Sequence, residues 1–77
     1  MMQERMQEVF RTVFEDQRLV ITPETTAKDI KMWDSLTHLE LIAAVENEFN
    51  VKFSFSEVMG FNSVGDMLRL LAQKTNA

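Results

Sequence analysis

The fold of this chain is decided by its central stretch, residues 33–49, which read WDSLTHLELIAAVENEF. From Ser35 to Phe49 there is no glycine or proline, and the stretch is rich in leucine, alanine and glutamate, which favour helix. Asp34 suits the N-cap position, because its carboxylate can accept hydrogen bonds from the free amides of the first turn. Asn50 is expected to end the helix. We therefore predict a helix over Ser35–Phe49.

The segment before this helix divides into two parts. From about Gln3 to Asp16, apolar residues recur at helical spacing and predict an amphipathic helix. From Gln17 to Asp34 that pattern breaks, and Pro23 disfavours a helix through the residue before it. We expect a long loop here, held on the core by scattered apolar residues, namely Leu19, Ile21, Ile30 and Trp33. Loops of this length in small domains tend to be functional.

The segment after the central helix predicts a connector and two more helical segments. Residues 51–53 alternate as an extended connector. Ser56 is expected to cap a short turn over residues 57–59, which Gly60 closes. Ser63 and Asp66 resemble a capping box that opens a last helix, with an apolar face made by Val64, Met67, Leu68 and Leu71. Residues 74–77 are expected to fray.

These elements predict an all-α fold in a single domain over residues 1–77. It is a small bundle of three main helices plus one short helix, with a long loop between the first and second helices. Apolar residues make up 45% of the 77 residues, enough for one modest core. The chain has no cysteine, which excludes disulfides and thiolate metal sites.

Charge narrows the classes of partner. The formal net charge is −4, and an acidic surface repels nucleic-acid phosphates, so we expect no nucleic-acid partner. A partner with a basic docking patch would fit better. No apolar run approaches the roughly 18–20 residues of a membrane span, and the charged N-terminus lacks a signal-peptide core. We predict a cytoplasmic protein with no membrane partner.

Few residues could support catalysis or metal binding. His38 is the only histidine, and we expect it to be an exposed surface residue. Ser35 and His38 lie three apart on one helix and could form a hydrolase pair, but no Gly-rich loop or oxyanion feature accompanies them. The glutamates at 46, 48 and 57 lack the spacing of a calcium loop. We therefore predict neither an enzyme nor a metal site.

The central helix has an unusual charge distribution. Between Asp34 and Phe49 there is no lysine or arginine, and the four acids of this stretch are Asp34, Glu40, Glu46 and Glu48. At 100° per residue, one side carries Thr37, Glu40, Ala44, Asn47 and Glu48. The residues alone leave two interpretations open for this acidic strip, a docking face or an ordinary solvated face. They likewise leave open whether Ser35 is structural or functional.

The same residues resemble the acyl carrier protein family. Its Asp-Ser-Leu signature is matched by residues 34–36, preceded by a long loop and followed by Leu-Glu-Leu-Ile at 39–42 and Glu-Asn-Glu-Phe at 46–49. The connector at 51–53 and the Asn-Ser-Val at 62–64 also fall where the family places theirs. The resemblance covers most of the chain and is strongest from Ile30 to Val64.

The resemblance implies that Ser35 carries a 4′-phosphopantetheine arm through a phosphodiester, installed from coenzyme A by a phosphopantetheinyl transferase. The arm's thiol would hold acyl groups as thioesters for enzymes of a fatty-acid, polyketide or related specialised pathway. It also implies a docking surface for basic patches on those enzymes, made by Asp34, Leu36, Glu40, Glu46 and Glu48. Asp34 would serve both capping and transferase recognition. We expect a monomer.

Three departures from the family pattern point to a dedicated pathway with fewer partners. Thr37 and Asn47 stand where acids are frequent, and Trp33 stands where a small or aliphatic residue is commoner. Two alternatives remain open. A carrier of aminoacyl or peptidyl groups would usually have two glycines where this chain has Met32 and Trp33. A helical adaptor would keep the fold and carry no arm.

Overall fold

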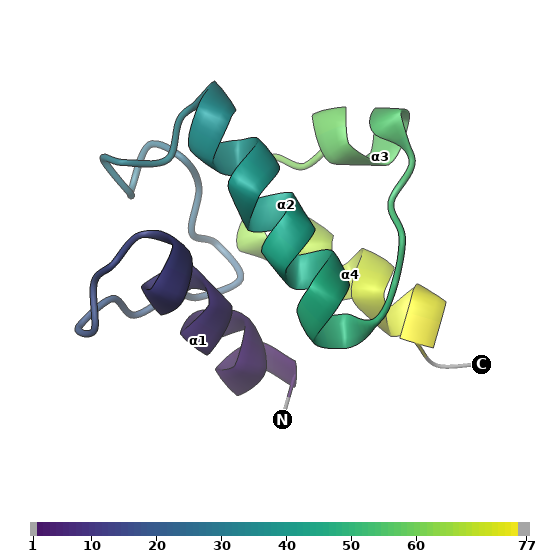
Figure 1. The fold of residues 1–77 in the computed structure, drawn as a ribbon, viewed down its shortest axis with the longest axis horizontal. Coiled ribbons are helices and arrows are strands. Elements are labelled where there is room, and N and C mark those ends of the chain that lie inside the picture. Colours follow the sequence, from purple (N-terminus) through teal and green to yellow (C-terminus); the bar gives the residue numbers. More distant parts are fainter. Residues whose placement is uncertain (1, 76–77) are drawn as a thin grey trace.

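A computed structural model describes residues 2–75. It contains four helices, α1 (Met2–Val13), α2 (Ser35–Phe49), α3 (Phe55–Met59) and α4 (Val64–Thr75). α1 runs beside α2, α4 passes behind α2, and the short α3 sits near the beginning of α2 (Figure 1). Residues 2–75 contain no β-strand. The predicted all-α bundle with a long first loop is confirmed.

One hydrophobic core is shared by all four helices and the long loop. The most deeply buried side chains come from α1, the long loop, α2 and α4: Met6, Phe10, Ile21, Leu41, Val45, Val64, Met67 and Leu71. Because the apolar faces of α1, α2 and α4 all point into this core, each helix depends on the others for burial.

α1 ends at Val13, three residues before the predicted end at Asp16. Glu15 adopts a left-handed conformation with φ of 53°. The amide of Asp16 donates to the Arg11 carbonyl at 3.0 Å, and the amide of Glu15 donates to the Thr12 carbonyl at 3.3 Å. This pair of bonds is a Schellman motif, which normally has glycine at its left-handed position. The sequence prediction was wrong because glutamate gives no such signal.

The long loop is held on the core as predicted. Ile21, Ile30 and Trp33 are buried, and Leu19 packs partly buried against them. Polar side chains of α1 bind the loop backbone: Arg11 Nε donates to the Leu19 carbonyl at 2.7 Å, and Gln7 Oε1 accepts from the Ile21 amide at 3.1 Å. The loop therefore needs no secondary structure of its own to be fixed in place.

The same loop closes the beginning of α4. The amides of Val64 and Gly65 donate to the carbonyls of Thr25 and Pro23, at 2.9 Å and 2.8 Å. A Cβ atom on Gly65 would lie only 2.9 Å from the Pro23 carbonyl oxygen, so the approach requires glycine. Two of the four free amides of the helix start are thus paired by a segment far away in sequence.

The caps of the last two helices differ in part from the prediction. α3 begins at Phe55, with Ser54 as its N-cap instead of the expected Ser56. Ser54 and Glu57 form a capping box, in which the Ser54 amide donates to the Glu57 carboxylate at 2.8 Å. The helix ends at Gly60 as predicted.

At the start of α4, Ser63 Oγ accepts from the Asp66 amide at 3.3 Å, but the Asp66 carboxylate accepts from the Asn62 amide and not from that of Ser63. Only half of the predicted box is present. At the other end, the expected fraying is wrong for Lys74 and Thr75, because α4 includes both and Lys74 binds Glu57 at 3.2 Å. Residues 76 and 77 lie outside the described residues.

Candidate functional site

Ser35 is the first residue of α2 and is exposed. Among residues 2–75, no group is hydrogen-bonded to its hydroxyl. The hydroxyl therefore lies free at the positive end of the helix dipole, which favours an anionic group.

Asp34 caps α2 as predicted. One carboxylate oxygen accepts from the amides of Thr37, at 2.9 Å, and Leu36, at 3.0 Å. These hydrogen bonds, that from Thr37 above all, hold the pKa of Asp34 below its usual value. Thr37 returns the contact, since its hydroxyl accepts from the Asp34 amide at 2.8 Å and donates to the Met32 carbonyl at 2.7 Å. Thr37 is thus the second half of a capping box.

His38 is not the exposed residue that we predicted. It is half-buried, and both ring nitrogens are engaged. Nδ1 accepts from the indole Nε1 of Trp33 at 3.0 Å, and Nε2 lies 3.1 Å from the carbonyl oxygen of Val58. The Trp33 and His38 rings are also stacked, 6.0 Å apart at 19°. With neither nitrogen available to take a proton from Ser35, the hydrolase alternative has no general base.

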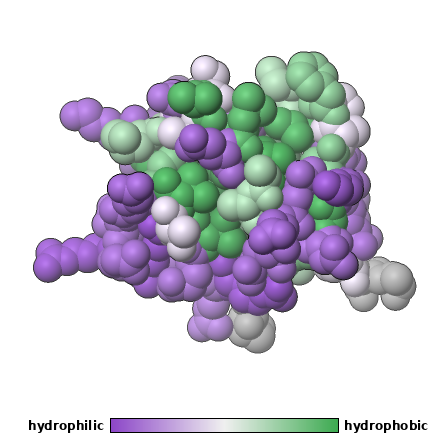
Figure 2. Space-filling view, viewed as in Figure 1, coloured by the Kyte–Doolittle hydropathy of each residue, from purple (hydrophilic) through white to green (hydrophobic). Residues whose placement is uncertain are grey.

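Beside Ser35, α2 and α3 enclose a groove of about 470 Å³ with a largely apolar lining. Three of its lining side chains are large, apolar and exposed: Leu39, Phe55 and Met59. Leu36, the residue after Ser35, was predicted to contact partners, and it is 67% exposed. Figure 2 shows hydrophobic side chains gathered over this upper part of the molecule, whereas the lower edge is mostly hydrophilic.

The predicted acidic docking residues differ in whether their carboxylates already bind other groups of the protein. Glu40 is exposed, and none of the groups of residues 2–75 is paired with its carboxylate. Glu46 is half-buried, and its carboxylate accepts from the Phe53 amide at 2.8 Å. Glu48 forms an ion pair with Arg5 at 3.0 Å. The unpaired acid of the strip, Glu40, thus lies in the first half of α2, while Glu46 and Glu48 are engaged in its second half.

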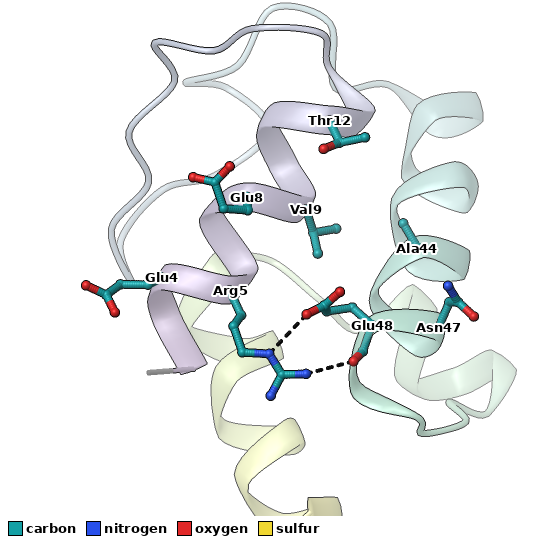
Figure 3. Close-up of a pocket in the computed structure, with 8 residues that line it drawn as sticks. All are labelled: Glu4, Arg5, Glu8, Val9, Thr12, Ala44, Asn47 and Glu48. Atoms are coloured by element: carbon teal, nitrogen blue, oxygen red, sulfur yellow. Dashed lines mark hydrogen bonds and ion pairs between the residues drawn. The ribbon is translucent and has the colours of Figure 1, made fainter.

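Arg5 is the residue that sequence reasoning missed. Its guanidinium donates to the Glu48 carboxylate and, at 2.8 Å, to the Glu48 carbonyl (Figure 3). It also lies 4.5 Å from the centre of the Phe49 ring. A cation at a helix C-terminus is favourable, so Arg5 fastens the end of α2 to α1. No basic residue occurs between Asp34 and Phe49, but in the folded structure Arg5 of α1 binds Glu48 of the acidic strip.

Neither metal binding nor a membrane span finds a structural basis in residues 2–75. No group of three or more histidine, aspartate or glutamate side chains is placed to hold a metal ion in this part of the chain. None of the helices described above has the length and apolar character needed to cross a bilayer.

Comparisons with known proteins agree on one family. The sequence profile described as "Phosphopantetheine attachment site" matches residues 4–71. The chain is similar in structure to the holo acyl carrier protein of Geobacter metallireducens, with a TM-score of 0.88 and 38% identity over 95% of this chain and 84% of that one. This chain belongs to the acyl carrier protein family. A putative acyl carrier protein from Mycobacterium tuberculosis is also similar, with a TM-score of 0.84 and 26% identity over 95% of this chain and 97% of that one. Comparison with curated protein sequences gives no significant match.

Family membership settles the broad class of this carrier. It is a non-catalytic carrier whose prosthetic group is phosphopantetheine, and its role requires a phosphopantetheinyl transferase and biosynthetic enzymes as partners. The predictions of family, fold, prosthetic group and absence of enzyme activity are confirmed. Ser35 lies within the matched residues, is exposed, and has no hydrogen-bond partner for its hydroxyl among residues 2–75.

Proposed function

We propose that Ser35 carries the 4′-phosphopantetheine arm and that the arm's thiol holds acyl intermediates as thioesters. The carrier passes them between enzymes of a fatty-acid, polyketide or related specialised pathway. The observation that carries this proposal is the free hydroxyl of Ser35 on the first residue of α2. It lies within the residues that match the attachment-site family.

The attachment chemistry needs nothing further from the carrier. The Ser35 oxygen forms a bond to the phosphorus next to pantetheine, the phosphoanhydride of coenzyme A breaks, and adenosine 3′,5′-bisphosphate leaves. The serine proton passes to the transferase. The new phosphodiester faces the amide end of α2, an interaction of roughly 0.3–1 kcal/mol for an exposed anion. The Asp34 carboxylate would repel the phosphate, but its hydrogen bonds to two amides offset part of its charge.

Docking is expected to centre on the first half of α2. Leu36 supplies an exposed apolar anchor next to Ser35, and Glu40 supplies an unpaired carboxylate. We assign a smaller part to Glu46 and Glu48, because a partner's cation would have to compete with the Phe53 amide or with Arg5. Weak exposed contacts suit a shuttle, which has to release each partner. The monomeric state and cytoplasmic location stay predictions.

The test is incubation of the purified protein with coenzyme A and a broad-specificity phosphopantetheinyl transferase, read by intact mass. The wild type should gain the mass of one phosphopantetheine group, and Ser35→Ala should gain none while its helix content is unchanged. Ser56→Ala, which removes another exposed serine hydroxyl, is the matched control and should be modified like the wild type.

A folded wild type that stays unmodified while a control carrier is converted would favour an adaptor without an arm. Modification of Ser35→Ala would mean that another residue carries the group. Mass spectrometry of the protein loaded in its native host would then separate acyl from aminoacyl or peptidyl cargo, because the cargo masses differ.

A further inference from the structure

His38 connects three segments of the chain at the groove beside Ser35. It projects from the second turn of α2, receives a hydrogen bond from Trp33 at the end of the long loop, and reaches Val58 on α3. Trp33 in turn packs edge-on against Phe10, at 5.3 Å between ring centres, and so joins this bridge to the core. Loss of the imidazole contacts would therefore affect the position of α3 relative to α2.

The bonding partners fix the protonation state of the bridging ring. An indole N–H can only donate, so Nδ1 of His38 has to be an acceptor and carries no proton. The Val58 carbonyl can only accept, so Nε2 carries the proton. The bridge thus requires the neutral imidazole with its proton on Nε2. A second proton would place an N–H on Nδ1 facing the indole N–H, and the bond to Trp33 could not persist.

The bridge lies at the inner side of the groove. Leu39, Phe55 and Met59 are 59%, 80% and 64% exposed and form its outer rim. The half-buried His38 and the buried Val58 form the wall toward the core. An apolar chain that entered between α2 and α3 would have to separate His38 from Val58 or Trp33. That separation leaves buried polar groups without partners, which is unfavourable.

We propose that His38 determines how far an acyl cargo can enter this protein. Its neutral ring closes the wall between the groove and the core, so a chain on the Ser35 arm lies along the apolar rim. This inference rests on the proposed attachment of the arm at Ser35, and it makes His38 a specificity-determining residue for short or surface-held acyl groups.

Charged groups near the ring leave the bridge undisturbed. Asp34, the N-cap of α2, is the only acid that lines the groove, and its carboxylate is bound to the Leu36 and Thr37 amides. On α3, Glu57 precedes Val58, but its carboxylate is held by the Ser54 amide and by Lys74 of α4. The α1 residues behind Trp33 are the uncharged Phe10 and Phe14.

The first test compares chain lengths. The wild type, His38→Ala and His38→Gln are each loaded by the transferase with butanoyl- or dodecanoyl-phosphopantetheine, and intact mass confirms loading. The urea midpoint of the loaded wild type should be the same for both chains. In His38→Ala it should be higher with dodecanoyl than with butanoyl. His38→Gln should resemble the wild type, because a carboxamide can accept from the indole and donate to Val58.

The proposal would be overturned if the urea midpoint of the loaded wild type rose from butanoyl to dodecanoyl by as much as that of His38→Ala. Failure of the proposed function looks different, because then no sample gains the mass of the arm.

The second test needs no arm and reads the bridge directly. Trp33 is the only tryptophan, so its indole N–H gives one resonance in the NMR spectrum. In His38→Ala that resonance and the Val58 amide should both move from their wild-type positions, because the imidazole that joins Trp33 to Val58 is gone. In His38→Gln both should stay closer to the wild type. If both resonances keep their wild-type positions in a folded His38→Ala, His38 does not hold the wall closed.

Discussion

Two of the grooves along α2 differ in which of their residues remain free to bind a partner. The groove toward α1, of about 490 Å³, has charged side chains from both helices among its lining residues and is crossed by the Arg5–Glu48 ion pair. The groove toward α3 is of similar size, but it is lined by exposed apolar side chains and opens beside the free Ser35 hydroxyl. The side of α2 that faces α1 therefore holds the helix in the bundle, while the side that faces α3 stays accessible beside Ser35. Four experiments can break or sharpen this contrast.

The largest expected effect is the difference in unfolding free energy between truncating a buried side chain and truncating an exposed one. Phe10→Ala removes a fully buried ring between α1 and the loop and should lower the free energy of unfolding by about 3–5 kcal/mol. Leu36→Ala, beside Ser35, should change it by less than about 0.5 kcal/mol, because the side chain is largely exposed. Urea unfolding measures both. A Leu36→Ala loss comparable to that of Phe10→Ala would mean that the functional side is also structural.

The next effect concerns docking at the free acid of α2. Glu40→Gln should slow modification by a basic transferase by up to about fivefold at low salt, the range expected for one exposed ion pair. The difference should shrink at high salt, where exposed charges are screened. Glu24→Gln, an exposed glutamate of the long loop, is the matched control for net charge. Equal slowing at both salt concentrations would contradict electrostatic docking.

A smaller effect is expected where Arg5 neutralises the strip. Arg5→Gln should cost about 0.2–1 kcal/mol of stability, because both partners of its ion pair are about half exposed. It also frees Glu48, so the transferase rate at low salt should rise, by about twofold or less. Arg18→Gln changes the net charge equally from the exposed loop. If both variants accelerate modification alike, the gain comes from overall charge and not from Glu48.

The smallest effect is at the cap of α2. Hydrogen bonds lower the pKa of Asp34 in the folded state, so its contribution to stability is present above the ordinary aspartate value of about 3.9 and is lost as the pH falls below it. Asp34→Asn keeps a good N-cap but cannot titrate there. The melting temperature of the variant should therefore fall less than that of the wild type between about pH 5 and about pH 3. Parallel curves would show that Asp34 is not linked to folding.

The features that were predicted correctly from the sequence depend on residues close together in the chain. The start of α2, its Asp34 cap and its end at Asn50 each depend on residues within a few positions, and all were correct. His38 was mispredicted because its partner on α3 lies 20 residues away, and the Arg5–Glu48 pair joins residues 43 positions apart. The Ser54–Glu57 box was readable as a pattern but was passed over for Ser56. Errors thus arose mainly where tertiary contacts override local signals.

The closure of α4 by the long loop has a consequence for how the chain folds. Because the Val64 and Gly65 amides find their acceptors at Thr25 and Pro23, the first turn of α4 cannot be completed until residues some forty positions earlier are in place. Hydrogen exchange at those two amides should follow local opening of the loop and not fraying of α4. A single proteolytic cut near Pro23 would accordingly loosen two distant parts of the protein together.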